Sequence, residues 1–125
     1  MQNPDNIRAL PVAEDLAVEV YRITRNFPRE ERFGLCAQMR RAAISIGSNI
    51  AEGCGRRGNR GLLAFVYIAI GSCNELAYQL RVSMRLGFVS RDEARAMTEL
   101  QESVHRMLSK LAAQLAKRPD LPPDE

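Results

Sequence analysis

The stretch that decides the fold is residues 60–86, RGLLAFVYIAIGSCNELAYQLRVSMRL. Apolar residues recur in it every three or four positions, which is the spacing of one face of an α-helix. This apolar stripe consists of Leu62, Val66, Ala69, Cys73, Leu76 and Leu80. Phe65, Ile68 and Met84 widen the apolar surface beyond that single face. Because so apolar a helix should be covered on more than one side, we expect it to contribute a subunit interface.

Weaker apolar periods predict three more helices, over about residues 12–26 and 29–52 and from Ser90 to the end at Arg118 and Pro119. Pro28 separates the first two, since proline disfavours helix at the residue before it. Gly87 suits the left-handed position that ends a helix, and Ser90 with Glu93 forms a capping box that opens the last one. No stretch alternates like a β-strand. We therefore predict an all-α fold, an antiparallel up-down four-helix bundle.

Composition agrees with one domain of this kind. The chain has 125 residues, of which 46% are hydrophobic and 26% charged, and these values exclude a disordered, collagen-like or disulfide-rich chain. We assign residues 1–118 to the bundle and expect 119–125 to form a short, disordered acidic tail. The longest apolar run, 62–70, is roughly half of a membrane span, and no signal peptide is evident. We expect a cytoplasmic protein with no membrane partner.

Charge is distributed unevenly along the chain. Residues 32–91 contain nine arginines and two glutamates, a net charge of +7, whereas residues 1–31 and 92–125 each carry −2. Arginine suits planar, bidentate contact with phosphate or carboxylate. A basic middle between acidic ends favours a polyanionic partner, or ion pairs with the acidic residues of the first and last helices across subunits.

Three of these arginines, Arg56, Arg57 and Arg60, lie among four glycines in residues 53–61. Glycine permits close backbone approach to a phosphate, and the following helix N-terminus favours an anion. This pattern is typical of sequence-independent contact with a nucleic-acid backbone. The alternative is a solvated flexible loop. We adopt these residues as candidate RNA- or DNA-binding residues.

A polar stripe follows the predicted helix 29–52. Its members, spaced to share one face, are Gln38, Arg41, Ser45, Asn49 and Glu52. The next helix carries Ser72, Glu75 and Gln79 at matching spacing. A charge in so apolar a helix should need a partner, for which Arg41 and Arg40 are candidates. The stripe is either a ligand pocket or a structural hydrogen-bonded network, and we favour a structural network of Arg41, Asn49, Glu52 and Glu75.

No catalytic or metal-binding constellation stands out. Residues 53–58 match G-x-G-x-x-G, but a dinucleotide site needs a preceding strand. Glu102 and His105 match one half of a di-metal bundle site, but His105 is the single histidine. The three cysteines form no C-x-x-C pair; Cys36 and Cys73 fit the core, and Cys54 should be accessible in the glycine-rich loop. We predict a protein that is not an enzyme, with no cofactor, metal or small-molecule substrate.

Four ordered motifs carry a family resemblance. They are Phe27-Pro-x-Glu-Glu31, Arg41-Ala-Ala-x-Ser-Ile46, Asn49-Ile-Ala-Glu-Gly53 and Gly71-Ser-x-x-Glu-Leu76. In these motifs the chain resembles the four-helix-bundle proteins encoded within intervening sequences of bacterial large-subunit ribosomal RNA genes. It is also similar to the accessory variability protein of diversity-generating retroelements.

The resemblance implies an up-down bundle that assembles as a ring-shaped homopentamer without known activity. It also implies structural roles for Arg41, Asn49, Glu52 and Glu75. The retroelement relatives are basic and are thought to engage nucleic acid. Two functions therefore remain open, namely an RNA- or DNA-associated module that uses the arginine-rich loop, and a structural or protein-interaction assembly without a nucleic-acid role.

Overall fold

A computed structural model describes residues 3–118 as six helical elements without a strand. The short 3₁₀ helix η1 (Pro4–Asn6) precedes α1 (Ala9–Thr24), and the 3₁₀ helix η2 (Arg29–Glu31) precedes α2 (Leu35–Cys54). The long helices α3 (Gly58–Arg85) and α4 (Arg91–Lys117) complete the chain. The predicted tail 119–125 lies outside the described residues.

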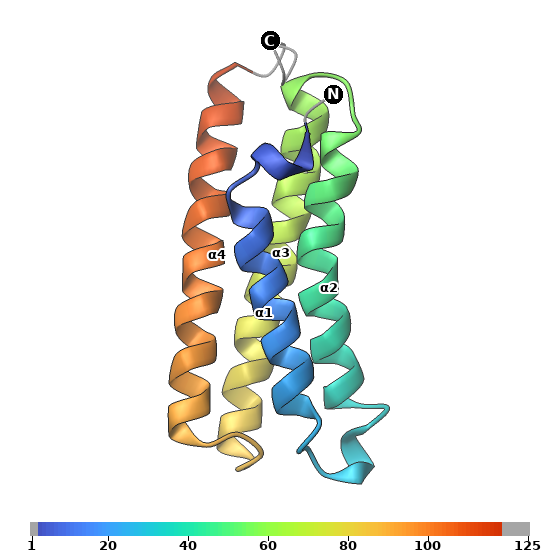
Figure 1. Ribbon diagram of the computed structural model, residues 1–125, viewed down its shortest axis with the longest axis vertical. Helices are drawn as coiled ribbons and strands as arrows, with labels where there is room; N and C mark the ends of the chain where they lie inside the picture. The colour runs from blue at the N-terminus through green and yellow to red at the C-terminus, as the bar shows by residue number, and fades with distance from the viewer. Residues whose placement is uncertain (1–2, 119–125) are drawn as a thin grey trace.

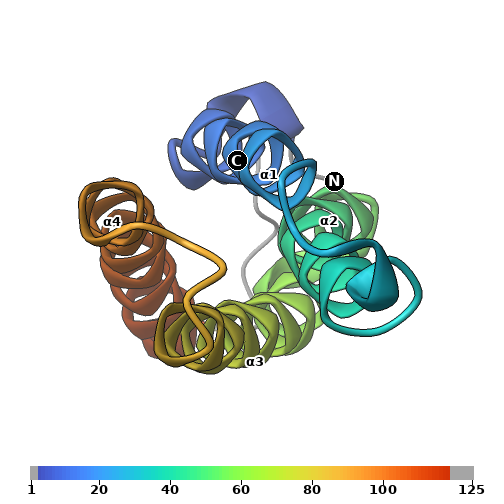
Figure 2. The same cartoon turned by 90° about the horizontal axis from the view of Figure 1, so that it is seen from below.

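The four long helices run alternately up and down and form a closed ring in chain order (Figures 1 and 2). Helix α3 packs against α2 and α4, and α1 packs against the same two helices from the opposite side. The α2–α3 turn lies at the same end of the bundle as the start of α1, and η2 lies at the other end (Figure 1). The predicted antiparallel up-down four-helix bundle is confirmed.

The core forms along the predicted apolar stripes. Every member of the stripe in residues 62–80 is buried, and α1 and α4 contribute Leu16, Val20, Met97 and Leu108, all fully buried. The apolar faces of all four helices point toward the bundle axis, where they bury one another. The charged faces remain in contact with solvent.

Two predicted helix ends are confirmed at the α3–α4 connection. Gly87 has a φ of +79°, the left-handed conformation that costs glycine little. The Ser90 hydroxyl accepts a hydrogen bond from the Glu93 amide at 3.1 Å, and the Ser90 amide donates to the Glu93 carboxylate at 3.3 Å. This reciprocal capping box fixes the start of α4.

Other predicted boundaries were wrong by a few residues. Helix α1 begins at Ala9, before Pro11, because the first helical turn tolerates proline. The predicted helix 29–52 is two elements, since Gly34 (φ −106°, ψ −112°) leaves the helical conformation between η2 and α2. Helix α2 continues through Gly53 to Cys54, and α3 begins at Gly58. The predicted glycine-rich loop is therefore a turn of three residues.

Helix α3 keeps a second apolar surface that the bundle does not cover. By length and composition it is the one helix within residues 3–118 that could cross a membrane, a test that the core helix of a bundle also passes. Its outer face, which we define as Ala64, Tyr67, Ile68, Gly71 and Tyr78, is exposed. Tyr67, Ile68 and Tyr78 are 56%, 51% and 67% exposed.

Candidate functional site

The three predicted nucleic-acid-binding arginines gather at the α2–α3 turn. Arg56 and Arg57 lie in the turn, and Arg60 lies in the first helical turn of α3. All three are exposed. Arg57 precedes Gly58, which adopts the left-handed conformation (φ +70°) where the chain turns back into α3. The turn thus presents the arginines at one end of the bundle, next to a helix N-terminus that favours anions.

Arg56 is partly engaged within the protein. Its Nη2 donates to the Glu52 carboxylate at 2.8 Å, and its guanidinium lies 4.9 Å from the centre of the Phe65 ring. Both side chains of this ion pair are more than half exposed, so the pair contributes at most about 1 kcal/mol. A phosphate can therefore compete with Glu52 for Arg56, whereas Arg57 has no ion pair within residues 3–118.

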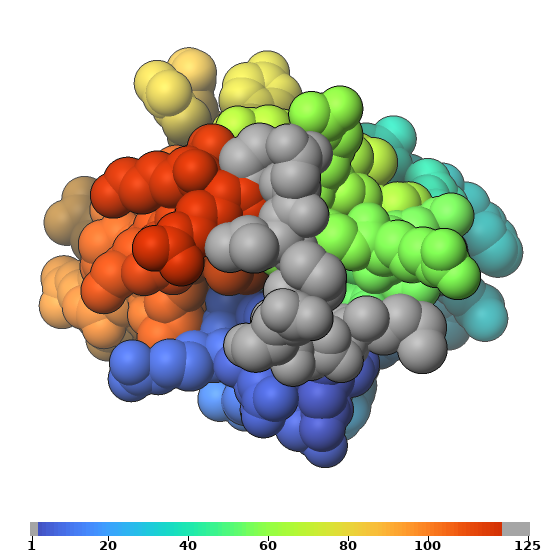
Figure 3. All heavy atoms as spheres, turned by 90° about the horizontal axis from the view of Figure 1, so that it is seen from above, coloured from blue at the N-terminus to red at the C-terminus, as the bar shows by residue number. Residues whose placement is uncertain are grey.

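The end of α4 joins this basic turn. Asn59 Nδ2 donates to the backbone carbonyl of Arg118 at 2.8 Å, although the two residues are 59 positions apart. Lys117 and Arg118 are exposed there. Figure 3 views this end of the molecule, with α4 in red and the α2–α3 segment in green. Sequence reasoning missed these two residues because only the bundle topology brings them to the turn. We call Arg56, Arg57, Arg60, Lys117 and Arg118 the basic end.

Part of the predicted polar stripe links α2 to α3. The hydroxyls of Ser45 and Ser72 lie 2.8 Å apart, and Asn49 Nδ2 donates to the Ser45 hydroxyl at 3.0 Å and to the Ser45 carbonyl at 2.8 Å. All three residues are half-buried. Such a chain of polar contacts specifies how the two helices align. Glu52 does not join it, because its carboxylate contacts Arg56 one turn further along.

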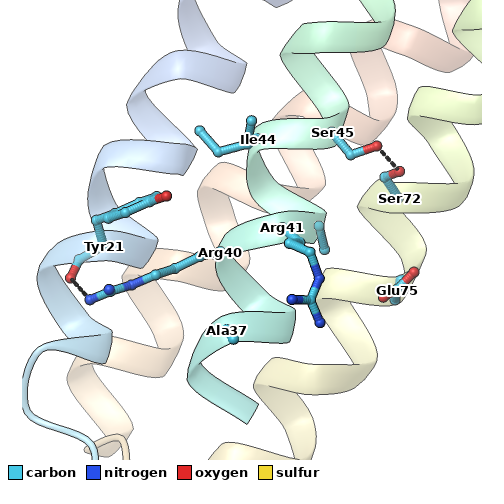
Figure 4. A pocket seen from close by; sticks show the side chains of 9 residues that line it. Tyr21, Ala37, Arg40, Arg41, Ile44, Ser45, Ser72 and Glu75 are labelled. Atoms are coloured by element: carbon cyan, nitrogen blue, oxygen red, sulfur yellow. Dashed lines mark hydrogen bonds between the residues drawn. The ribbon is translucent and has the colours of Figure 1, made fainter. Parts of the chain in front are cut away.

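Arg41 and Glu75 line a surface groove beside these serines (Figure 4). The groove encloses about 670 Å³, and both residues are exposed. The expected buried pairing of Glu75 was wrong. Its carboxylate accepts a hydrogen bond from Gln79 at 3.0 Å and lies within 4.0 Å of neither Arg40 nor Arg41. Because Glu75 lies on the outer side of α3, water solvates its charge and no buried partner is required.

Arg40 instead binds α1. Its Nε donates to the Thr24 hydroxyl at 2.9 Å, its Nη2 donates to the Tyr21 carbonyl at 3.4 Å, and its guanidinium lies 4.6 Å from the centre of the Tyr21 ring. The bond to Tyr21 is drawn in Figure 4. This arginine therefore joins the end of α1 to α2.

The thiols lie in the core. Cys36 and Cys73 are buried as predicted, but the expected accessible Cys54 was wrong, since it is 1% exposed at the end of α2. Burial raises the pKa of the Cys54 thiol. Burial also raises the pKa of Cys73, although a hydrogen bond with Gln101 opposes the shift. A protonated, inaccessible thiol is a poor nucleophile.

These features define a four-helix-bundle protein with an exposed basic end and a polar groove. In residues 3–118, no cluster of three or more His, Cys, Asp or Glu side chains is placed to hold a metal ion.

The family follows from sequence comparison. Residues 5–110 match the family model described as 23S rRNA-intervening sequence protein, so the chain belongs to that family. No curated protein matches the chain.

A solved structure supports the same fold. It is a protein of unknown function from the S23 ribosomal protein family of Bacteroides thetaiotaomicron, with a TM-score of 0.75 and 20% sequence identity. The similarity covers 83% of this chain and 97% of that one.

Proposed function

We propose that this protein is a non-enzymatic, cytoplasmic homo-oligomer, a homopentamer, that associates with RNA or DNA through its basic end. The observation that carries the proposal is the convergence of Arg56, Arg57 and Arg60 with the end of α4 through the Asn59–Arg118 hydrogen bond. Five exposed cations on one end of each chain suit contact with a phosphate backbone, which carries no sequence information itself.

Oligomerisation would strengthen such contacts. The outer face of α3 exposes the apolar side chains of Tyr67, Ile68 and Tyr78 together with the charged Glu75, and exposed apolar side chains gathered on one helix mark an interaction site. A ring of copies joined through this face would present several basic ends to one polyanion. Weak contacts at each end would then add by avidity.

The test is fluorescence anisotropy of labelled RNA and DNA at two salt concentrations. We expect binding that weakens steeply with salt, because each neutralised phosphate releases a counterion. The variant Arg56→Glu/Arg57→Glu/Arg60→Glu should lose binding while its circular dichroism spectrum and oligomer mass stay unchanged. Ribosomal RNA compared with a random sequence would show whether sequence matters.

A matched control separates local from total charge. The variant Arg91→Glu/Arg95→Glu/Arg106→Glu makes the same change in net charge on exposed positions of α4, and it should retain most of the affinity. Equal losses in the two variants would rule out the basic end as the binding site. No binding by an intact oligomer at low salt would favour a structural or protein-interaction assembly instead.

A further inference from the structure

A second concentration of arginine lies at the opposite end of the bundle. Where η2 connects α1 to α2, a surface pocket of about 320 Å³ is lined by Arg25, Arg29, Arg32 and Arg40. No Asp or Glu side chain lines this pocket. Four like charges around one hollow repel one another, and an anion in the hollow would relieve that repulsion.

The innermost of these arginines is held in place by the fold. The contacts of Arg40 with Thr24 and Tyr21 fix the plane of its guanidinium. Thr24 is itself 3% exposed, and its hydroxyl donates to the Val20 carbonyl at 2.7 Å. A donor fixed in this way loses little conformational entropy when a ligand binds.

The other three arginines surround Arg40 without acidic partners. Arg25, Arg29 and Arg32 are exposed and form no ion pair within residues 3–118. The nearby Glu31 is used elsewhere, because its carboxylate accepts a hydrogen bond from the Leu35 amide at 3.3 Å. The guanidinium charges therefore stay available to a ligand.

The backbone favours the same ligand charge. Cys36, in the first turn of α2, lines the pocket, so the positive end of the helix dipole lies beside the arginines. Planar guanidinium groups bind tetrahedral oxyanions such as phosphate through paired hydrogen bonds. The volume lies at the lower end of the roughly 300–1,000 Å³ typical of small-molecule sites, which suits a compact ligand.

We propose that the pocket at η2 binds a phosphate group, either inorganic phosphate or the monoester of a nucleotide. This site shares no residue with the basic end and lies at the other end of the bundle. It therefore stands whether or not the protein binds RNA or DNA through the basic end.

The experiment is isothermal titration calorimetry of the full chain at constant ionic strength with inorganic phosphate, adenosine 5′-monophosphate and adenosine. We expect saturable binding of the two phosphate-bearing ligands, and none of adenosine. Equal affinity for the two would identify phosphate itself as the ligand, whereas tighter binding of the monophosphate would identify an ester. Absence of saturable binding by both would overturn the proposal.

Two variants of equal charge locate the site. Arg25→Gln/Arg29→Gln/Arg32→Gln should weaken phosphate binding at least tenfold. Arg81→Gln/Arg85→Gln/Arg91→Gln, which neutralises three exposed arginines of α3 and α4, should leave it unchanged. Equal weakening by both would show a general charge effect and overturn the assignment.

A conservative variant tests the role of Arg40. Arg40→Lys keeps the charge but lacks the planar pair of donors, so it should also weaken binding while the protein keeps its helical content. The Arg56→Glu/Arg57→Glu/Arg60→Glu variant should bind phosphate normally. That result would separate this site from the basic end.

Discussion

The buried thiols of Cys54 and Cys73 make the stability of the protein depend on pH. Cys54 and Cys73 have ordinary pKa values of 9.0, and burial raises both in the folded protein. The unfolded chain therefore releases these protons at lower pH than the folded chain does. Their contribution to stability is complete below about pH 9 and is lost as the pH rises through the folded-state pKa values.

We predict that the free energy of unfolding falls as the pH rises above about 9, the ordinary pKa of these thiols. The variant Cys54→Ala/Cys73→Ala should show a shallower fall, even though removing two buried side chains lowers its stability at every pH. Urea denaturation across this range measures both slopes. Identical slopes would mean that the thiols do not contribute to the pH dependence.

The sequence was enough to predict which apolar side chains are buried. It was not enough to predict which partners the long polar side chains contact. The apolar period places Leu62 and Leu76 in the core without knowledge of the neighbouring helix. The partners of Arg40 and Glu75 could not be predicted in this way, because a long polar side chain has several possible partners within reach. The helical period identifies the face on which Arg40 lies, but not that Thr24 and Tyr21 of α1 would receive its hydrogen bonds.

At the scale of the elements, the approach of α2 to α3 depends on one glycine. A Cβ atom at Gly53 would lie 2.8 Å from the Cβ of Phe65 and 2.9 Å from a methyl carbon of Leu62. These distances are too short for unstrained contact, so a side chain there would push the two helices apart. At Gly47, in the same helix, the nearest atom is a Leu10 methyl carbon at 3.6 Å, an ordinary contact.

The same substitution should therefore have opposite effects at the two positions. Gly53→Ala should destabilise the protein by about 1–3 kcal/mol, the cost of overpacking. Gly47→Ala should stabilise it by roughly 0.5–1 kcal/mol, because alanine loses less backbone entropy in a helix. Chemical denaturation of both variants measures this. Stabilisation by Gly53→Ala would show that α2 and α3 have room to adjust.

Helix ends were predictable where a local motif specifies them. Ser90 with Glu93 and the left-handed Gly87 depend on neighbours within a few residues, and both were found as expected. The start of α2 was not predictable. Glu30 and Glu31 favour the first turn of a helix, and the helical pattern of the sequence continues from there past Gly34, where the structure interrupts it. Nothing in residues 29–35 alone shows that the interruption is preferred.

At the scale of the whole molecule, the exposed apolar surface of α3 leads to a prediction about assembly. We expect light scattering of the protein to give about five times the chain mass of 14.0 kDa. Replacing Ile68 and Tyr78 by aspartate should yield monomers, since charges would then lie in the apolar contact.

The control for assembly is Val18→Asp, which places one aspartate charge on α1 at a position 68% exposed. It should leave the mass unchanged. Circular dichroism should show that all variants keep their helices. A wild-type mass of one chain, or an intact oligomer in the double variant, would contradict the proposed interface.

The candidate sites illustrate what only the complete fold reveals. Arg56, Arg57 and Arg60 form a local cluster and were found from sequence. Lys117 and Arg118 join them only because the fourth helix returns to the end of the bundle where the third begins. The η2 pocket likewise needs Arg25 and Arg40, which lie on opposite sides of a chain reversal.

The apolarity of α3 has a consequence for the protein during its synthesis on the ribosome. Helix α3 is long and apolar enough to cross a membrane. As it leaves the exit tunnel, it therefore resembles the segments that targeting factors capture. Its most extensive partner, α2, is made first and emerges before it. Because contacts between segments close in sequence form faster than distant ones, the α2–α3 hairpin can cover one side of α3 while α4 is still being translated. The order of the helices thus shortens the time during which nascent α3 is exposed to mistargeting.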